Sequence, residues 1–202
     1  DVIGYTVKVL SNGNYLIIAP SWDNGSAIDA GAVAWGNGSS GTSGVMSASN
    51  ALVGAPGYDE VGEQEAGGES IFALNNGNYL VLSPMWNNAA ILDAGAATWG
   101  NGNTGSSGLI SSANSLVGGR TNDKIGMHSY NAIGGACVLN NGNYVVISPF
   151  WNDGNFQMVG AVTWGNGSTG SSGVVNSSNS LVGDTTGDYI GGSGVTALSN
   201  GH

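Results

Sequence analysis

One hairpin motif recurs along this chain at nearly constant spacing, and that recurrence limits the possible folds more than any other feature. The motif is a leucine, a polar residue, Asn-Gly-Asn-Tyr and an apolar run, with a tryptophan seven residues after the tyrosine. These tryptophans are Trp22, Trp86 and Trp151, which are 64 and 65 residues apart. Self-similarity at a fixed period of this length predicts a tandem array of structural repeats.

The spacing divides the chain into three repeats and a fragment. We expect repeats over residues 1–60, 61–124 and 125–189, and the first strand of a further repeat over residues 190–202. That fragment contains Leu198-Ser199-Asn200-Gly201, which matches the start of the hairpin motif. The repeats differ most in the connectors between them, which we therefore expect to be loops.

Each repeat contains four short apolar segments separated by turn residues, and none shows a sustained helical period. In the first repeat we expect strands over residues 3–10, 15–19, 31–35 and, more weakly, 44–53. Asn12-Gly13 predicts a tight hairpin turn, because both residues tolerate positive φ. The continuous apolar run over residues 15–19 is typical of a central strand covered on both faces.

The predicted fold class is all-β, with tandem four-stranded antiparallel blades of the β-propeller type. A different β-solenoid, a stack of sheets and a β-sandwich are the alternatives. Propellers contain at least about four blades. Three blades therefore need further repeats or other chains to complete a ring, or they join head to tail through open strand edges into a filament.

Composition excludes several functions. Only 8% of the 202 residues are charged, 37 are glycine, and the net charge is −10. The three basic residues, Lys8, Arg120 and Lys124, form no cluster in the sequence. Nucleic acid is therefore not an expected partner, because phosphate binding needs clustered Lys and Arg. No apolar stretch reaches the roughly 18 residues that a membrane span needs.

The order of elements from Leu10 to Pro20 and then Ala30-Gly31-Ala32-Val33 resembles the FG-GAP blades of integrin-type propellers. Many such blades carry an Asp-rich calcium loop between their first two strands. Here that loop is Ser11-Asn12-Gly13-Asn14, and its equivalents also lack carboxylates. Because calcium binding normally uses carboxylates, we expect no metal site, and we expect no cofactor.

A second resemblance concerns the stretch from Gly160 to Gly170, followed by Asn179-Ser180-Leu181-Val182-Gly183. It is similar to tandem repeats of large bacterial surface proteins of the filamentous-haemagglutinin type. That similarity implies a secreted or cell-surface location and an adhesive role. It supplies no binding residues that can be transferred to this chain.

The sequence contains no recognisable catalytic constellation. His128 and His202 have no Ser, Cys or carboxylate partner at a spacing typical of a triad. We therefore expect a protein without enzymatic activity and assign no catalytic residue.

The tryptophans and the polar residues that follow them are the candidate ligand-binding positions. An indole offers a face on which a sugar can stack, while an adjacent amide or carboxylate can bind hydroxyl groups. For these tryptophans structural packing is the first interpretation and ligand binding the second, and we expect packing for Trp35, Trp99 and Trp164 as well. The six candidate residues are Trp22, Asp23, Trp86, Asn87, Trp151 and Asn152.

One further series of residues recurs with the repeat. We expect Asp59, Asp123 and Asp188 to cap turns by accepting backbone N–H groups.

Two functional hypotheses follow from the sequence. The first is a non-enzymatic extracellular repeat module of a bacterial surface adhesin, with carbohydrate as its candidate ligand. The second is a structural subunit of a surface fibre that self-associates, or associates with neighbouring repeats, through open β-edges.

Overall fold

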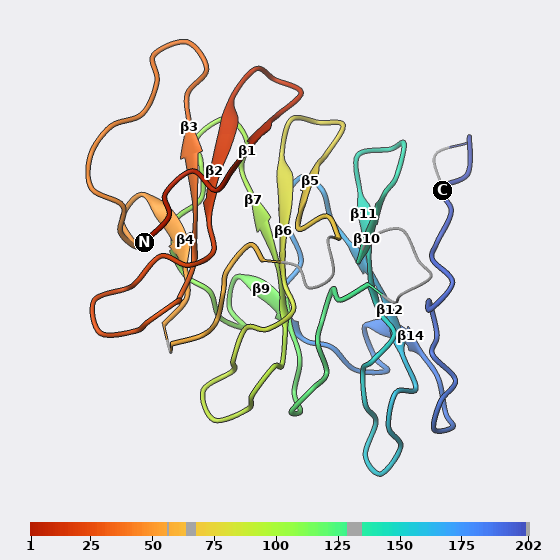
Figure 1. Ribbon diagram of the computed structural model, residues 1–202. Coiled ribbons are helices and arrows are strands. Elements are labelled where there is room, and N and C mark those ends of the chain that lie inside the picture. Colours follow the sequence, from red (N-terminus) through yellow and green to blue (C-terminus); the bar gives the residue numbers. More distant parts are fainter. Residues whose placement is uncertain (56, 64–67, 129–134, 201–202) are drawn as a thin grey trace.

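A computed structural model of the chain describes residues 1–55, 57–63, 68–128 and 135–200 (Figure 1). The regular structure of these residues consists of strands alone, in three sheets that follow the three repeats. Within this described part there is no helix with the length and hydropathy that crossing a membrane would need.

The four main strands of each repeat form an antiparallel meander. In the first repeat these are β1 (Thr6–Val9), β2 (Tyr15–Ala19), β3 (Ala32–Gly36) and β4 (Ala51–Val53). In the second they are β5 (Ile71–Ala73), β6 (Tyr79–Ser83), β7 (Ala96–Gly100) and β9 (Ser115–Val117). In the third they are β10 (Ala136–Val138), β11 (Tyr144–Ser148), β12 (Ala161–Gly165) and β14 (Ser180–Val182).

Two short strands join neighbouring repeats. β8 (Gly108–Leu109) belongs to the second repeat but pairs in parallel with β4 of the first. β13 (Gly173–Val174) of the third repeat pairs in the same way with β9 of the second. The single strand predicted over residues 44–53 is therefore wrong in its extent, because only residues 51–53 form the fourth strand of their own sheet.

The hairpin motif folds as its sequence predicts. Gly13 has a φ of 85°, its N–H donates to the Leu10 carbonyl at 3.0 Å, and Asn12 Oδ1 accepts the Asn14 N–H at 3.1 Å. The tyrosine that follows the turn lies opposite a glycine of the next strand, as in the pair Tyr79 and Gly100. A Cβ at Gly100 would overlap the Tyr79 ring, so this position excludes every larger residue. This requirement explains the invariable Trp-Gly dipeptide at the end of the third strand.

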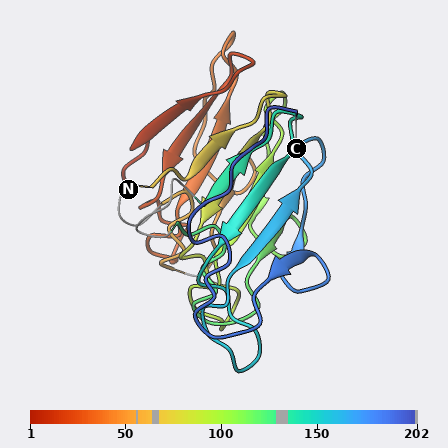
Figure 2. The ribbon, with the colours of Figure 1, turned by 90° about the vertical axis from the view of Figure 1, so that its right-hand side faces the viewer.

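The three sheets stack face to face in a row, with the hairpin turns at the top and the tryptophan-containing loops at the bottom of Figure 1. Figure 2 shows the same stack turned by 90°. One hydrophobic core lies between the first and second sheets and includes Leu16, Ile18 and Val81. Another lies between the second and third sheets and includes Leu80, Leu82 and Val146. Strand β6, in the middle, is buried along its whole length, whereas β2, for which cover on both faces was expected, keeps Tyr15 and Ile17 partly exposed because its sheet lies at the end of the row.

A recurring polar contact locks each sheet to the next. The Gly102 carbonyl of the second repeat accepts N–H groups from Asn12, Asn14 and Trp35 of the first, at 2.8, 2.8 and 2.9 Å. The Gly167 carbonyl of the third repeat accepts the equivalent groups of the second at 2.8, 2.9 and 2.9 Å. Those equivalent donors are Asn76, Asn78 and Trp99. Trp35 and Trp99 therefore serve in packing between repeats, as expected.

On the two outer faces of the stack, the residues that the structure describes supply no glycine carbonyl of this kind. Trp164 occupies the position of Trp99 but is 51% exposed, and Leu181 is 70% exposed where Leu116 is 2% exposed. At the opposite end, Val7 and Val9 are exposed. The all-β, blade-like fold class is confirmed, and the described blades form an open row without a closed barrel.

Candidate functional site

The motif tryptophans are part of the core. Trp22, Trp86 and Trp151 are only 8%, 4% and 4% exposed, and they pack in three separate hydrophobic clusters. A sugar needs an open indole face for stacking, and none of the three provides one. Their burial leaves no face for stacking against a ligand, and the packing interpretation describes them.

The amides that follow two of these tryptophans hold neighbouring repeats together. Asn87 donates its backbone N–H and its Nδ2 to Asp59 Oδ1 at 3.0 and 2.9 Å, while its Oδ1 accepts the Asp93 N–H at 3.0 Å. At the next junction, Asn152 donates its backbone N–H and its Nδ2 to Asp123 Oδ1, and its Oδ1 accepts the Met158 N–H. These groups are already hydrogen-bonded within the protein, so they are poor candidates for binding sugar hydroxyls.

The recurring aspartates do more than the turn capping that their sequence predicts. Asp59 Oδ2 accepts the Ala55 N–H, and Asp123 Oδ2 accepts those of Gly119 and Arg120, which confirms the capping. The other oxygen of each carboxylate reaches the following repeat. In the first repeat Asp23 replaces the asparagine, and its backbone N–H donates to Asp1 at 2.9 Å.

Burial changes the acidity of these carboxyl groups. Asp59 and Asp123 are 0% exposed. Desolvation raises the pKa of Asp59 to about 6 from its ordinary value of 3.8, although its bonds from Asn87 and Ala55 oppose that shift. Desolvation also raises the pKa of Asp123.

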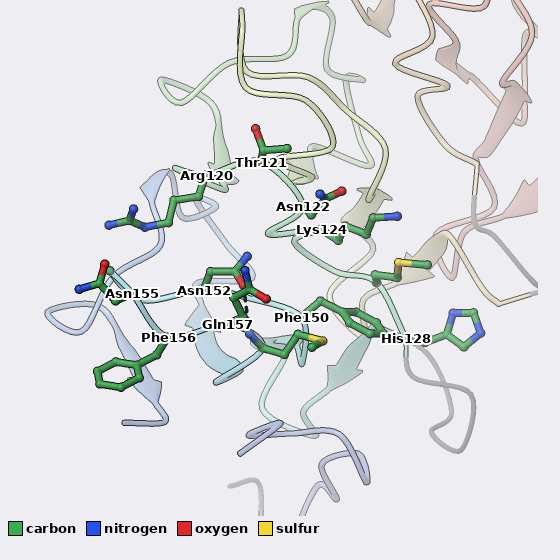
Figure 3. Close-up of a pocket in the computed structure, with 13 residues that line it drawn as sticks. Arg120, Thr121, Asn122, Lys124, His128, Phe150, Asn152, Asn155, Phe156 and Gln157 are labelled. Carbon is green, nitrogen blue, oxygen red and sulfur yellow. Dashed lines mark hydrogen bonds between the residues drawn. The ribbon is translucent and has the colours of Figure 1, made fainter. Parts of the chain in front are cut away.

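A groove of about 690 Å³ lies beside the Asp123–Asn152 contact (Figure 3). One wall comes from residues 120–128, in the connector between β9 and β10. The other comes from residues 150–158, in the loop between β11 and β12. A volume of this size lies within the range of small-molecule binding sites.

The groove combines cations, aromatic rings and amides. Its walls include Arg120, Lys124 and His128, the rings of Phe150 and Phe156, and the amides of Asn155 and Gln157. Figure 3 shows Arg120, Asn155 and Phe156 on one side of this group and Lys124 and His128 on the other. Of the predicted ligand-binding residues, the groove contains only Asn152.

A rigid turn presents Phe156. Asp153 and Phe156 exchange two backbone hydrogen bonds, of 3.0 and 2.8 Å, around Gly154 and Asn155. The Phe156 side chain is 47% exposed. Phe150 is half-buried and meets Tyr189 edge to face, with ring centroids 6.3 Å apart. The two phenylalanines therefore supply apolar surface at fixed positions, which suits a ring-shaped ligand.

The features that the three repeats share do not predict this groove. The groove depends on positions at which they differ. Phe156 stands where the other repeats have Ala27 and Ile91, and Lys124 where they have Glu60 and Tyr189. A comparison of equivalent positions among the repeats would have revealed the concentration of basic and aromatic residues.

The rings, amides and cations of the groove suit the binding of a polar ligand. Within the described residues, no three His, Cys, Asp or Glu side chains gather as metal ligands would. The groove walls contain His128 but no carboxylate with which it could form an acid–base pair.

The buried aspartates predict an unusual dependence of stability on pH. Because the folded-state pKa of Asp59 lies above its unfolded value, the folded state binds the proton more tightly. The associated stability is present below the unfolded pKa and is lost as pH rises through about 6. We expect the free energy of unfolding in urea to fall by about 1–3 kcal/mol between pH 5 and pH 7.5.

Asp59→Asn should reduce this dependence on pH, and Asp123, whose pKa is raised by the same cause, should supply the remainder. Asp188→Asn should leave the dependence unchanged, because Asp188 occupies the same position in the third repeat but is exposed. An unfolding free energy that increases from pH 5 to pH 7.5 in the unmodified protein would contradict this explanation.

Comparison with known proteins identifies the repeat. No curated protein matches the chain. A family described as "Repeat of unknown function (DUF5650)" matches residues 9–63, 73–127 and 138–192. Each match runs from the first hairpin of a blade to the connector that follows its fourth strand. The matches cover most of the sequence, and the chain therefore belongs to the DUF5650 family of repeats.

Proposed function

We propose that the chain is a non-enzymatic, extracellular repeat module of a bacterial surface adhesin and that the groove between its second and third repeats binds carbohydrate. The observation that carries this proposal is the meeting of an exposed aromatic ring, a second, half-buried ring and amide side chains in that groove. Sugars combine apolar ring faces with a rim of hydroxyl groups. A site for them therefore needs aromatic surface and hydrogen-bonding groups together.

The side chains of the groove match these needs. Phe156 offers an accessible ring, and the exposed amides of Asn155 and Gln157 flank it in the sequence. The Phe156 backbone is fixed by its two hydrogen bonds with Asp153. The loop backbone that carries the ring therefore loses little conformational freedom when a ligand binds.

Two further observations support an extracellular module without catalysis. The chain has few charged residues and many glycines, and it resembles repeats of bacterial surface proteins. Among the described residues that line the groove, there is no pair of titratable groups of the kind that general acid–base catalysis uses.

The proposal predicts that glycan binding depends on the Phe156 ring. Phe156→Ile introduces the residue that the second repeat carries at this position, Ile91, so the turn should still fold. We expect Phe156→Ile to weaken the strongest signal on a glycan array by about three- to tenfold, because stacking is lost. Phe156→Tyr, which keeps the ring, should retain the signal. A blank array for the unmodified protein, or equal signals for all three proteins, would refute carbohydrate binding in this groove.

The second candidate function is a subunit of a surface fibre, and the exposed outer faces of the stack favour it. Val7 and Val9 at one end and Trp164 and Leu181 at the other occupy positions that pack between sheets elsewhere in the chain. Copies that stack head to tail would cover both faces and form a heterologous contact that can propagate.

The fibre hypothesis predicts a molar mass that increases with protein concentration in multi-angle light scattering. Leu181→Asp places a charge on one outer face and should hold the protein as a monomer, because burying an unpaired carboxylate is unfavourable. Asp184→Asn, in the exposed connector beyond β14, serves as the surface control. A constant monomer mass up to millimolar concentration would exclude this mode of assembly.

A further inference from the structure

We infer that the groove between the second and third repeats selects an anionic saccharide, a sugar whose ring carries a carboxylate or a sulfate ester, and that Arg120 binds the anionic group. This inference rests on the proposed carbohydrate binding and names the class of sugar. It is carried by the charges around the groove and by the partners that those charges have or lack.

Positive charge in this chain is scarce and concentrated. Three Lys and Arg residues stand against 13 Asp and Glu, and two of the three basic residues line the groove. The third, Lys8, forms an ion pair with Glu69 in a hollow that also contains Glu60 and Glu63. An anionic ligand would be repelled by most of the surface, so the groove is the favoured place for it to bind.

The Arg120 side chain is available to a ligand. It is exposed, and it has no ion pair with any residue that the structure describes. The nearby Asp123 carboxylate is occupied by the backbone N–H groups of Gly119 and Arg120 and by Asn152. The guanidinium therefore lies on a backbone that is held in place, while no described residue accepts a hydrogen bond from its own donors.

Lys124 contributes less than Arg120. Its Nζ lies 3.7 Å from Asp93 Oδ2 and 3.8 Å from Met85 Sδ, so part of its charge is compensated. Guanidinium also suits the task better than ammonium, because its planar set of donors matches a carboxylate or sulfate with two parallel hydrogen bonds.

The junction between the first and second repeats provides an internal comparison. Lys124 and Glu60 occupy equivalent positions and both have a φ of 46°. The same backbone therefore carries a positive charge at one junction and a negative charge at the other. Within the described residues no Asp or Glu lines the groove, whereas the first junction carries Glu60 and Glu63 at the positions of Lys124 and Met127. Selection for anions is thus a property of one junction and not of the repeat in general.

The positions of these groups suggest how the ligand lies. Its ring would rest on Phe156, its anionic group would face Arg120, and its hydroxyl groups would meet Asn155 and Gln157, which all line the same groove (Figure 3). Carboxylate and sulfate share this chemistry, so the experiment includes both.

The test uses the intact chain and a panel of matched glycan pairs. The panel contains hexuronate oligosaccharides beside their methyl esters, and sulfated and sialylated glycans beside their neutral parents. Arg120→Thr introduces the residue that the third repeat has at this position, Thr185. Lys8→Thr removes the same charge from the first sheet and is the control. Dissociation constants of the strongest pair are then measured by calorimetry at low and high salt.

We expect the acidic member of a pair to bind and its neutral partner to bind at least about tenfold more weakly, with affinity that decreases at high salt. Arg120→Thr should weaken binding of the acidic member by about ten- to a hundredfold, because charged hydrogen bonds are lost. Lys8→Thr should change it by less than about twofold. Comparison of the carboxylate and sulfate arms then identifies the anionic group.

The two proposals fail in different ways. Equal binding of acidic and neutral partners, with no effect of Arg120→Thr but with loss on Phe156→Ile, would overturn the anionic inference and leave carbohydrate binding intact. Equal losses for Arg120→Thr and Lys8→Thr would also overturn it, since the effect would then come from net charge alone. Absence of binding to every glycan in the panel would overturn both proposals.

Discussion

Three N–H groups that converge on one glycine carbonyl hold each blade of this protein to the next. Two asparagines of the hairpin turn and the tryptophan at the end of the third strand all donate to a carbonyl of the following repeat, Gly102 or Gly167. The residue must be glycine, because a Cβ at Gly102 would overlap the Gly77 carbonyl. The Asn-Gly-Asn turn and the Trp-Gly-Asn-Gly segment are thus the two halves of one contact, which explains why they recur together.

A second contact secures the opposite end of each junction. Asp59 and Asp123 bind the loops that follow Trp86 and Trp151, at the end of the sheets away from the hairpin turns. With both ends fixed by residues that repeat, the connector and the loop between them can change without loss of the stack. The groove lies at such a variable place. Its Arg120, Lys124 and Phe156 have no counterparts of the same kind in the other repeats.

Local patterns predicted the strands well where a strand pairs within its own repeat. The predicted segment over residues 15–19 coincides with β2, and the Asn12-Gly13 turn forms as expected. The segment over residues 44–53 could not be divided correctly from sequence. In the second and third repeats, the residues equivalent to 44–45 form β8 and β13. These strands form only because they pair with the preceding sheet, and such a tertiary contact leaves no local periodicity.

The candidate site was less predictable, because one composition supports two physical roles. A tryptophan followed by an amide suits a sugar-binding loop, and it equally suits a packed junction in which the amide binds a carboxylate of the neighbouring repeat. Trp86 and Asn87 take the second role, since Asp59 lies within hydrogen-bonding distance although it is 28 residues away in the sequence. The groove forms because the fold brings residues 120–128 and 150–158 side by side, and no local sequence pattern predicts that proximity.

The central claim is that the N–H groups converging on the glycine carbonyl stabilise the stack. The free energies of unfolding of two tryptophan variants test this claim most directly. Trp99→Phe removes the indole N–H that donates to Gly167, whereas Trp164→Phe removes the same group where no described residue accepts it. The account predicts that Trp99→Phe lowers the unfolding free energy by about 1–2 kcal/mol, and that Trp164→Phe changes it by less than about 0.5 kcal/mol. Equal effects of the two substitutions would contradict it.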